Sequence, residues 1–178
     1  SSEEETLFLV ALGEQNEFIQ GVVGWVDLQS ENIEDRLAYF TQFEAIKGFR
    51  HIVQGEKDPT FLQRKEFIKG VKTLASFDLS YDLLIYPHQM ASAITFCETC
   101  DEQRIVLDHL AKEPLKSGDI SGWKKQLQSF KNLGHVSAKI SGIVTEAADK
   151  HWNQNQVNEI VDIALEVFGP KRLLIGSD

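Results

Sequence analysis

Short apolar runs alternate with longer amphipathic stretches along almost the whole chain. The runs are rich in Val, Ile and Leu, and their length and composition are typical of buried strands. They cover residues 21–28, 48–53, 81–86, 104–107, 136–140 and 172–175. Between them, apolar residues recur at the spacing of a helical face, most clearly at Val157, Ile160, Val161 and Ala164. We expect helices over 3–15, 33–43, 66–77, 89–99, 122–133 and 155–168.

Local signals mark several boundaries of these elements. Ser30 is placed to cap the helix that begins at Ile33. Pro87 ends the strand that precedes it, because proline cannot donate to a strand ladder. Gly169 and Pro170 follow the last helix, as a left-handed cap followed by a helix breaker would.

The regular alternation of strand and helix indicates a parallel sheet covered by helices. Two architectures fit this pattern, an open doubly wound sheet and a (β/α)8 barrel. The sequence has neither Gly-x-Gly-x-x-Gly nor Gly-x-x-x-x-Gly-Lys, so the nucleotide-binding versions of the open sheet lose support. No low-complexity linker divides the chain, and we expect residues 1–178 to form a single domain.

Composition and charge narrow the class of partner. The 178 residues are 42% hydrophobic and 25% charged, as in ordinary globular proteins. Twenty-seven acidic residues against 18 basic ones give a net charge of −9, which argues against nucleic acid or a membrane surface as a partner. Two cysteines and the absence of a secretory signal favour the cytoplasm. We expect a small-molecule substrate, and we leave a homo-oligomer open.

Polar side chains stand at the carboxyl ends of the predicted strands, where parallel β/α folds place their chemistry. His109 directly follows an apolar strand, at a position where an imidazole can serve as an acid, a base or an oxyanion donor. Asp178 ends the last strand, where a carboxylate can bind a metal or take a proton from water. A helix cap is the alternative role for Asp178. These two are the candidate catalytic residues.

Four further residues are candidates for substrate binding: Arg50, His51, Tyr86 and Lys139. Arg50 and His51 are adjacent, so only one of them can face the interior of a regular strand. Packing of Tyr86 in its loop and an edge position for Lys139 are the alternative interpretations.

Several other polar residues receive structural interpretations. Asp108 is expected to point away from His109 and to bond within its loop. His135 and His151 are expected at the surface. Cys97 and Cys100 form a Cys-x-x-Cys at a helix C-terminus, where the dipole does not favour a thiolate, so we expect incidental thiols.

Six segments in order resemble the amidohydrolase-related family of TIM-barrel hydrolases. They are GVVGWVDL (21–28), KGFRHIVQ (47–54), YDLLIYP (81–87), VLDHLAK (106–112), KISGIVTE (139–146) and LIGSD (174–178). The most similar branch is that of the sugar lactonases, the L-fuconolactonase-like proteins, with 2-pyrone-4,6-dicarboxylate lactonase as a cousin.

The resemblance implies a (β/α)8 barrel with an Asp at the end of the eighth strand and a His near the end of the sixth, which match Asp178 and His109. The six strands would then be strands three to eight, without the first two strands and the C-terminal helix. The implied reaction is hydrolysis of a sugar lactone or related cyclic ester by base-activated water. The resemblance leaves two alternatives for the cofactor. The site holds either one divalent metal such as zinc, bound by His109 and Asp178, or no metal. Metal-dependent amide hydrolysis, decarboxylation and a non-catalytic fragment are the alternatives.

Overall fold

The computed structural model describes residues 1–112, 119–146 and 152–178. Its strands are β1 (Val22–Gly24), β2 (Ile46–Ile52), β3 (Ser80–Leu84), β4 (Ile105–Leu107), β5 (Val136–Ile140) and β6 (Leu173–Ile175). Its α-helices are α1 (Glu3–Gln15), α2 (Ile33–Phe40), α3 (Lys65–Ser76), α4 (Met90–Thr99), α5 (Ser121–Leu127) and α6 (Gln154–Phe168). The alternation predicted from the apolar pattern is therefore confirmed for the described residues.

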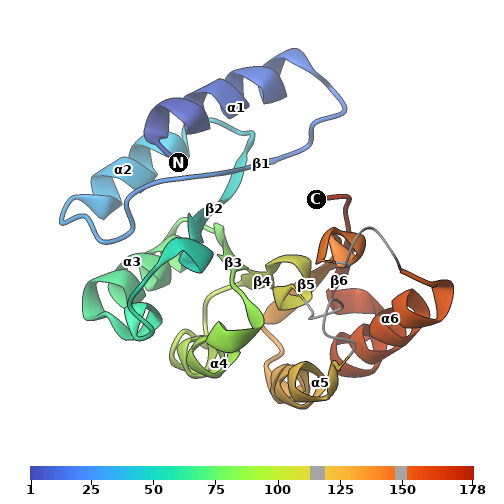
Figure 1. The fold of residues 1–178 in the computed structure, drawn as a ribbon. Coiled ribbons are helices and arrows are strands. Elements are labelled where there is room, and N and C mark those ends of the chain that lie inside the picture. The colour runs from blue at the N-terminus through green and yellow to red at the C-terminus, as the bar shows by residue number, and fades with distance from the viewer. Residues whose placement is uncertain (113–118, 147–151) are drawn as a thin grey trace.

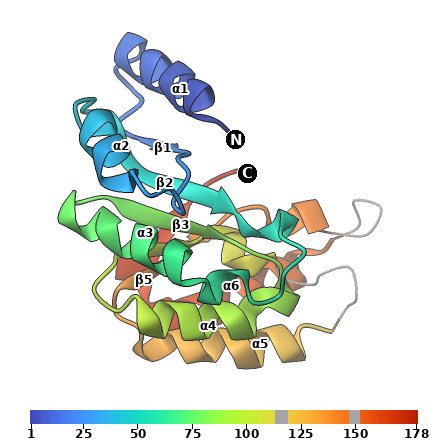
Figure 2. The same cartoon turned by 90° about the vertical axis from the view of Figure 1, so that its left-hand side faces the viewer.

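The six strands form one parallel sheet in the order β1-β2-β3-β4-β5-β6. A doubly wound sheet reverses its strand order at a switch point, whereas a barrel keeps the order of the chain. The sheet is curled, and α3, α4, α5 and α6 lie along its outer side (Figure 1). Figure 2 shows α1 and α2 at the end of the sheet formed by β1 and β2. This is the arrangement of part of a TIM barrel.

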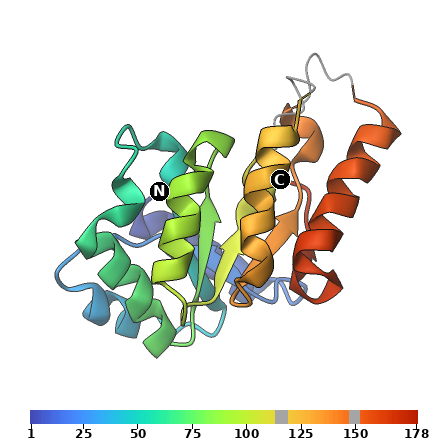
Figure 3. The ribbon, with the colours of Figure 1, turned by 90° about the horizontal axis from the view of Figure 1, so that it is seen from below.

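The two faces of the sheet differ in chemistry because successive side chains of a strand point to opposite sides. Side chains on the outer face are apolar or aromatic and almost fully buried: Phe49, Tyr81, Leu83, Ile105, Leu107, Val136 and Ala138. They form the core with the helices, of which α4, α5 and α6 lie next to one another in Figure 3 (green, orange and red). The inner face carries Arg50, Asp82 and Lys139. These three charged side chains therefore lie on the concave side of the sheet.

Strand β1 is shorter than the apolar run 21–28 predicts, because a side chain of α1 binds the backbone directly after it. The Thr6 hydroxyl of α1 accepts from the backbone N–H of Trp25 at 2.7 Å and donates to the carbonyl of Trp25 at 2.8 Å. Both ladder groups of Trp25 are thus engaged by a side chain, and the strand ends at Gly24.

The expected cap at Ser30 is wrong. Asn32 is the N-cap of α2 and makes no side-chain capping bond, while the Ser30 hydroxyl donates to Asn32 Oδ1 at 2.6 Å. Gly169 does follow α6 with a positive φ of 66°, but its ψ of 169° is extended and not left-handed helical. Among the described residues, no helix has the length and apolar character needed to cross a membrane.

Candidate active site

A network of four charged side chains spans the concave face. Lys139 of β5 lies between two carboxylates: its Nζ is 2.6 Å from Asp108 Oδ1 and also contacts Asp82 Oδ2 on β3. From β2, Arg50 Nη1 donates to Asp108 Oδ2 at 3.1 Å. The expectation that Asp108 bonds within its own loop is wrong. Its fully buried side chain points across the sheet because it pairs there with Arg50 and Lys139.

The charge state of this network follows from burial and pairing. Burial raises the pKa of Asp82, and the nearby charge of Asp108 raises it further. Burial would lower the pKa of Lys139, but the two carboxylates outweigh that effect and raise it. Lys139 therefore stays protonated at neutral pH and offsets the charge of both acids. Such a network is costly to break on one side, because an unpaired buried charge remains.

Beside this network, His109 and Asp178 face each other. His109 Nε2 lies 3.2 Å from Asp178 Oδ1, and the side chains are only 10% and 26% exposed. The other ring nitrogen, Nδ1, forms a hydrogen bond of 2.7 Å with the hydroxyl of Ser141. Asp178 Oδ2 contacts the ammonium of Lys112. The structure therefore brings the two predicted catalytic side chains together, as the strand-end argument expected.

His109 and Lys112 lie at the two ends of a backbone segment after β4 that has an unusual conformation. His109, Leu110, Ala111 and Lys112 all have positive φ angles, of 50°, 51°, 59° and 54°. A left-handed conformation costs a non-glycine residue about 1–2 kcal/mol, and runs of it are rare. We call residues 109–112 the left-handed turn. Strain of this kind concentrates at functional sites and persists only where tertiary contacts hold it.

Packing holds the left-handed turn in place. Leu110 and Ala111 are completely buried. The carbonyl of Leu110 accepts a hydrogen bond of 2.8 Å from the indole N–H of Trp123 on α5. Within the turn, the N–H of Lys112 donates to the carbonyl of His109 at 2.8 Å. Two carbonyls of the turn, those of His109 and Leu110, are thus paired.

The loop after β5 leaves room for the carboxylate of Asp178. Gly142 has a φ of +67°, and a Cβ built on it would lie 2.5 Å from Asp178 Oδ2. Thr145 Oγ1 donates to the carbonyl of Gly142 at 2.7 Å and accepts from Lys112 Nζ at 3.1 Å. A glycine is needed here for both its conformation and the space that it leaves.

Protonation states at the pair follow from the same contacts. Burial would raise the pKa of Asp178, but the hydrogen bond from Lys112 and the charges of His109 and Lys112 outweigh it and lower the pKa. Burial lowers the pKa of His109, and this effect exceeds the opposing attraction of Asp108 and Asp178. Near neutral pH, Asp178 is therefore ionised and His109 is a neutral imidazole.

Two of the predicted substrate-binding residues lie elsewhere. The ring of His51 stacks on Phe61 at 4.8 Å, and its Nε2 lies 2.7 Å from Glu56 Oε1. His51 thus packs on the helical side of the sheet, and of the adjacent pair only Arg50 faces the concave side. Tyr86 lies in the loop after β3, is 39% exposed, and packs against His88 with ring centroids 6.0 Å apart.

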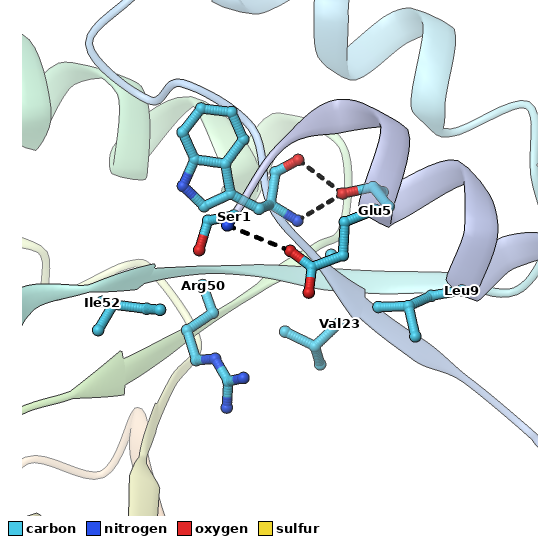
Figure 4. A pocket seen from close by; sticks show the side chains of 9 residues that line it. Ser1, Glu5, Leu9, Val23, Arg50 and Ile52 are labelled. Atoms are coloured by element: carbon cyan, nitrogen blue, oxygen red, sulfur yellow. Dashed lines mark hydrogen bonds and ion pairs between the residues drawn. The ribbon is translucent and has the colours of Figure 1, made fainter.

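Arg50 also borders a small hollow of about 80 Å³ between α1, β1 and β2. Figure 4 shows its guanidinium beside Val23 and Ile52, with Glu5 and Leu9 of α1 opposite. The side chain of Arg50 is 41% exposed, so it retains donors that are accessible to solvent after pairing with Asp108.

The other histidines and the cysteines have structural positions. His135 is half-buried and donates from Nε2 to the carbonyl of Cys97 at 3.0 Å, so the expected surface position is wrong. His151 lies outside the described residues. Cys97 and Cys100 are free and buried. Burial raises the pKa of Cys97 and raises that of Cys100 to about 11, so neither is a thiolate at neutral pH.

Sequence reasoning left three contributors without a role. Lys112 and Ser141 stand at strand ends, but no sequence pattern assigns them a catalytic or binding role. The local sequence also does not mark Gly142 as part of the site. The spacing of His109 and Lys112 carries no signal unless the chain between them is known to be left-handed. The contact of Gly142 with Asp178 joins two separate loops and is invisible in either segment alone.

Comparison with known proteins identifies the family and supports the fold. The amidohydrolase family profile matches residues 3–178. L-fucono-1,5-lactonase of Burkholderia multivorans (strain ATCC 17616 / 249) is 35% identical over 98% of this chain and 62% of its own length. A crystal structure of an amidohydrolase from Burkholderia multivorans with bound zinc is 34% identical, with a TM-score of 0.94 over 100% of this chain and 65% of that one. A putative 2-pyrone-4,6-dicarboxylic acid hydrolase from Pseudomonas putida, 17% identical with a TM-score of 0.75, covers 96% of this chain and 61% of its own and shares the fold.

The chain belongs to the amidohydrolase family. It spans about three fifths of the length of the curated relatives that it matches.

The described residues offer an incomplete set of ligands for a catalytic zinc. Such sites use three protein ligands, usually histidine and carboxylate. Within residues 1–112, 119–146 and 152–178, no group of three or more His, Cys, Asp or Glu side chains could hold a metal ion. His109 and Asp178 are two ligands, and the second oxygen of Asp178 faces the ammonium of Lys112. These residues alone do not fit a zinc site.

Proposed function

We propose that the full-length protein hydrolyses a sugar lactone, with Asp178 as the general base and His109 as the hydrogen-bond donor to the carbonyl oxygen. The observation that carries this proposal is the contact of an ionised carboxylate with a neutral imidazole at the carboxyl ends of the strands. In this proposal, the six strands are strands three to eight of a (β/α)8 barrel. The similarity to L-fucono-1,5-lactonase supports the choice of a lactone.

The partners of His109 assign its proton. A carboxylate can only accept, so the nitrogen that faces Asp178, Nε2, carries the hydrogen. Nδ1 then holds a lone pair and accepts from the hydroxyl of Ser141. In the free protein the single N–H of His109 therefore faces Asp178. In the proposal the substrate carbonyl replaces Asp178 as its acceptor, and Asp178 is then free to accept a proton. The two groups therefore take different roles in the same reaction.

The proposed reaction starts with water between Asp178 and the lactone carbonyl. Asp178 accepts a proton from the water as the oxygen attacks the carbonyl carbon and a tetrahedral intermediate forms. The negative charge that develops on the carbonyl oxygen is stabilised by the N–H of His109 and the nearby ammonium of Lys112. The bond to the ring oxygen then breaks, and the alkoxide takes the proton from Asp178. The product is a hydroxy acid, and Asp178 is again ionised.

The charge balance of the concave face supports a neutral substrate. Each cation of the described cluster already faces a carboxylate: Arg50 and Lys139 face Asp108, Lys139 also faces Asp82, and Lys112 faces Asp178. A dicarboxylate substrate needs an excess of positive charge, which this cluster does not supply. A polyhydroxylated lactone needs hydrogen bonds rather than countercharge.

Arg50 is our candidate for binding the hydroxyl groups of the sugar, because its side chain is exposed next to the hollow of Figure 4. Tyr86 remains a candidate through its exposed loop position. We assign Lys139 to the support of the site, since its ammonium is engaged by two buried carboxylates. His51 is left out because it stacks on Phe61. A cytoplasmic location is part of the proposal and is supported by the two free cysteines, which suit a reducing compartment.

Turnover of L-fucono-1,5-lactone and other aldonolactones by the full-length protein, followed by acid release, tests the proposal. Asp178→Asn should lower kcat about 1,000-fold, because the base is lost. Asp35→Asn on the exposed face of α2 is the matched control and should leave kcat unchanged. Undiminished turnover in Asp178→Asn would remove Asp178 from the mechanism.

A metal-dependent hydrolase of the same fold is the second candidate, favoured by the zinc in the related crystal structure. The two candidates differ in their response to chelation. The proposed mechanism uses ester carbonyls, which are reactive enough for base-activated water, and predicts that dialysis against a chelator leaves kcat within about twofold. Loss of activity that is restored by stoichiometric zinc would favour the second candidate.

A further inference from the structure

We propose that Asp108 is a positioning residue: its buried carboxylate anchors the left-handed turn, which presents His109 and Lys112 to the two oxygens of Asp178. The inference rests on the proposed function, since it explains how the reacting groups of that reaction are held. It adds a residue that neither touches Asp178 nor reaches the substrate.

The tight winding of the turn brings two side chains to Asp178. The N–H of Lys112 bonds to the carbonyl of His109 three residues earlier, as in a tight helical turn. In such a turn the side chains at positions i and i+3 lie above one another. His109 and Lys112 therefore project from the same side, and they contact Oδ1 and Oδ2 of the same carboxylate.

The local sequence does not favour this conformation. Positions 109–112 are His-Leu-Ala-Lys, without the glycine or asparagine that adopts positive φ at low cost. An isolated peptide of this sequence would leave the left-handed region. Contacts with other elements must therefore hold the turn, and those contacts become part of the functional site.

Asp108 is the first of these contacts, directly before the first left-handed residue. Its side chain is fully buried, and each oxygen faces a cation from a different strand: Arg50 on β2 and Lys139 on β5. The chain direction is thus fixed at the point where the turn begins. Trp123 supplies a second contact, to the carbonyl of Leu110 in the middle of the turn.

Asp82 provides a matched comparison within the same network. It is also a buried carboxylate and also pairs with Lys139. However, it lies inside β3, where its backbone is held by the sheet ladder on both sides and is not part of the left-handed turn. Removal of either acid disturbs the charge balance around Lys139, but only the removal of Asp108 releases the turn.

The test uses the full-length protein with Asp108→Asn and Asp82→Asn. Two kinds of measurement are made: the kinetics with L-fucono-1,5-lactone, which give kcat and KM, and the ¹⁵N resonances of the His109 ring. The ring resonances are assigned by their loss in His109→Asn. We expect Asp108→Asn to lower kcat more than tenfold, with a smaller change in KM, and to shift both ring nitrogens. Asp82→Asn should keep kcat within twofold and leave the ring resonances in place.

Equal effects of the two substitutions on kcat and on the His109 resonances would overturn the proposal, because a general loss of charge balance would then explain both. Unchanged values in Asp108→Asn would also overturn it. Should Asp108→Asn fail to fold, Trp123→Phe removes the hydrogen bond to Leu110 together with part of the buried ring, and it must shift the His109 resonances for the proposal to stand. If the wild-type protein does not hydrolyse the lactone, the proposed function fails, whereas the ring resonances still decide the role of Asp108.

Discussion

Lys112 and Asp178 form an ion pair although they lie 66 residues apart in the chain. The pair joins the left-handed turn after β4 to the end of β6, and it places an ammonium on one oxygen of the candidate base while His109 faces the other. The same contact therefore both holds Asp178 in place and lowers its pKa.

The first prediction concerns the pH dependence of the reaction. The hydrogen bond from Lys112 lowers the pKa of Asp178 against the opposing effect of burial. Its removal in Lys112→Met should raise that pKa, because the ionised form loses its stabilising partner. The acid limb of the kcat/KM profile should then move to higher pH, and kcat at neutral pH should fall about tenfold. The exposed Lys125→Met on α5 is the control. An acid limb that stays in place would separate Lys112 from the base.

The second prediction concerns the space beside Asp178. Gly142→Ala adds a Cβ that would lie 2.5 Å from Asp178 Oδ2 and 3.1 Å from Lys112 Nζ, at a φ of +67°. The carboxylate must move, and we expect kcat to fall more than about tenfold, because displacement of a reacting group by an ångström is costly. Unfolding in urea should show a loss of about 1 kcal/mol. Gly134→Ala meets nothing within 4 Å and serves as the control. Normal kcat in Gly142→Ala would mean that Asp178 does not need its present position.

The third prediction concerns the stability of the charged network. Lys139→Met leaves Asp82 and Asp108 buried without their shared cation, and it should lower the free energy of unfolding at neutral pH by about 3–5 kcal/mol.

Part of that loss should return in acid. Burial already raises the folded-state pKa of Asp82, and removal of Lys139 should raise it further. The unfolded state then gives up its proton at lower pH than the folded state, so stability falls as pH rises from about 3.8 to the folded pKa. Denaturant unfolding across pH checks this, and a loss that does not depend on pH would contradict the role of charge.

The fourth prediction separates stability from catalysis. Arg172 directly precedes β6, whereas Asp178 follows the other end of that strand. Its guanidinium donates to six backbone carbonyls, those of Lys131, Phe130, Leu133, Val136, Val167 and Phe168. Arg172→Met leaves these carbonyls without the donor and should cost about 2–4 kcal/mol of unfolding free energy. The exposed Arg104→Met is the control and should cost less than about 1 kcal/mol. The kcat of Arg172→Met at 25 °C should match that of the wild type.

The order and type of the strands and helices can be predicted from the amino-acid pattern alone, because apolar periodicity is a local property of the chain. The helix over 3–15 and the strand over 136–140 have the predicted bounds. The same reasoning places His109 and Asp178 at one edge of the sheet, after β4 and β6, since all strands of a parallel sheet end on one side. Strand alternation predicts that only one of Arg50 and His51 faces the concave side, but it does not predict which one.

The remaining features of the site depend on contacts between elements that are distant in the chain. Asp108 turns across the sheet because Arg50 and Lys139 approach it from other strands, and no local rule contains that information. The left-handed turn opposes the intrinsic preference of its residues and exists because burial and distant hydrogen bonds outweigh that preference. The position of Asp178 depends in the same way on Lys112 and Gly142. Local patterns fix elements, whereas the orientation of charged side chains depends on partners that are distant in sequence.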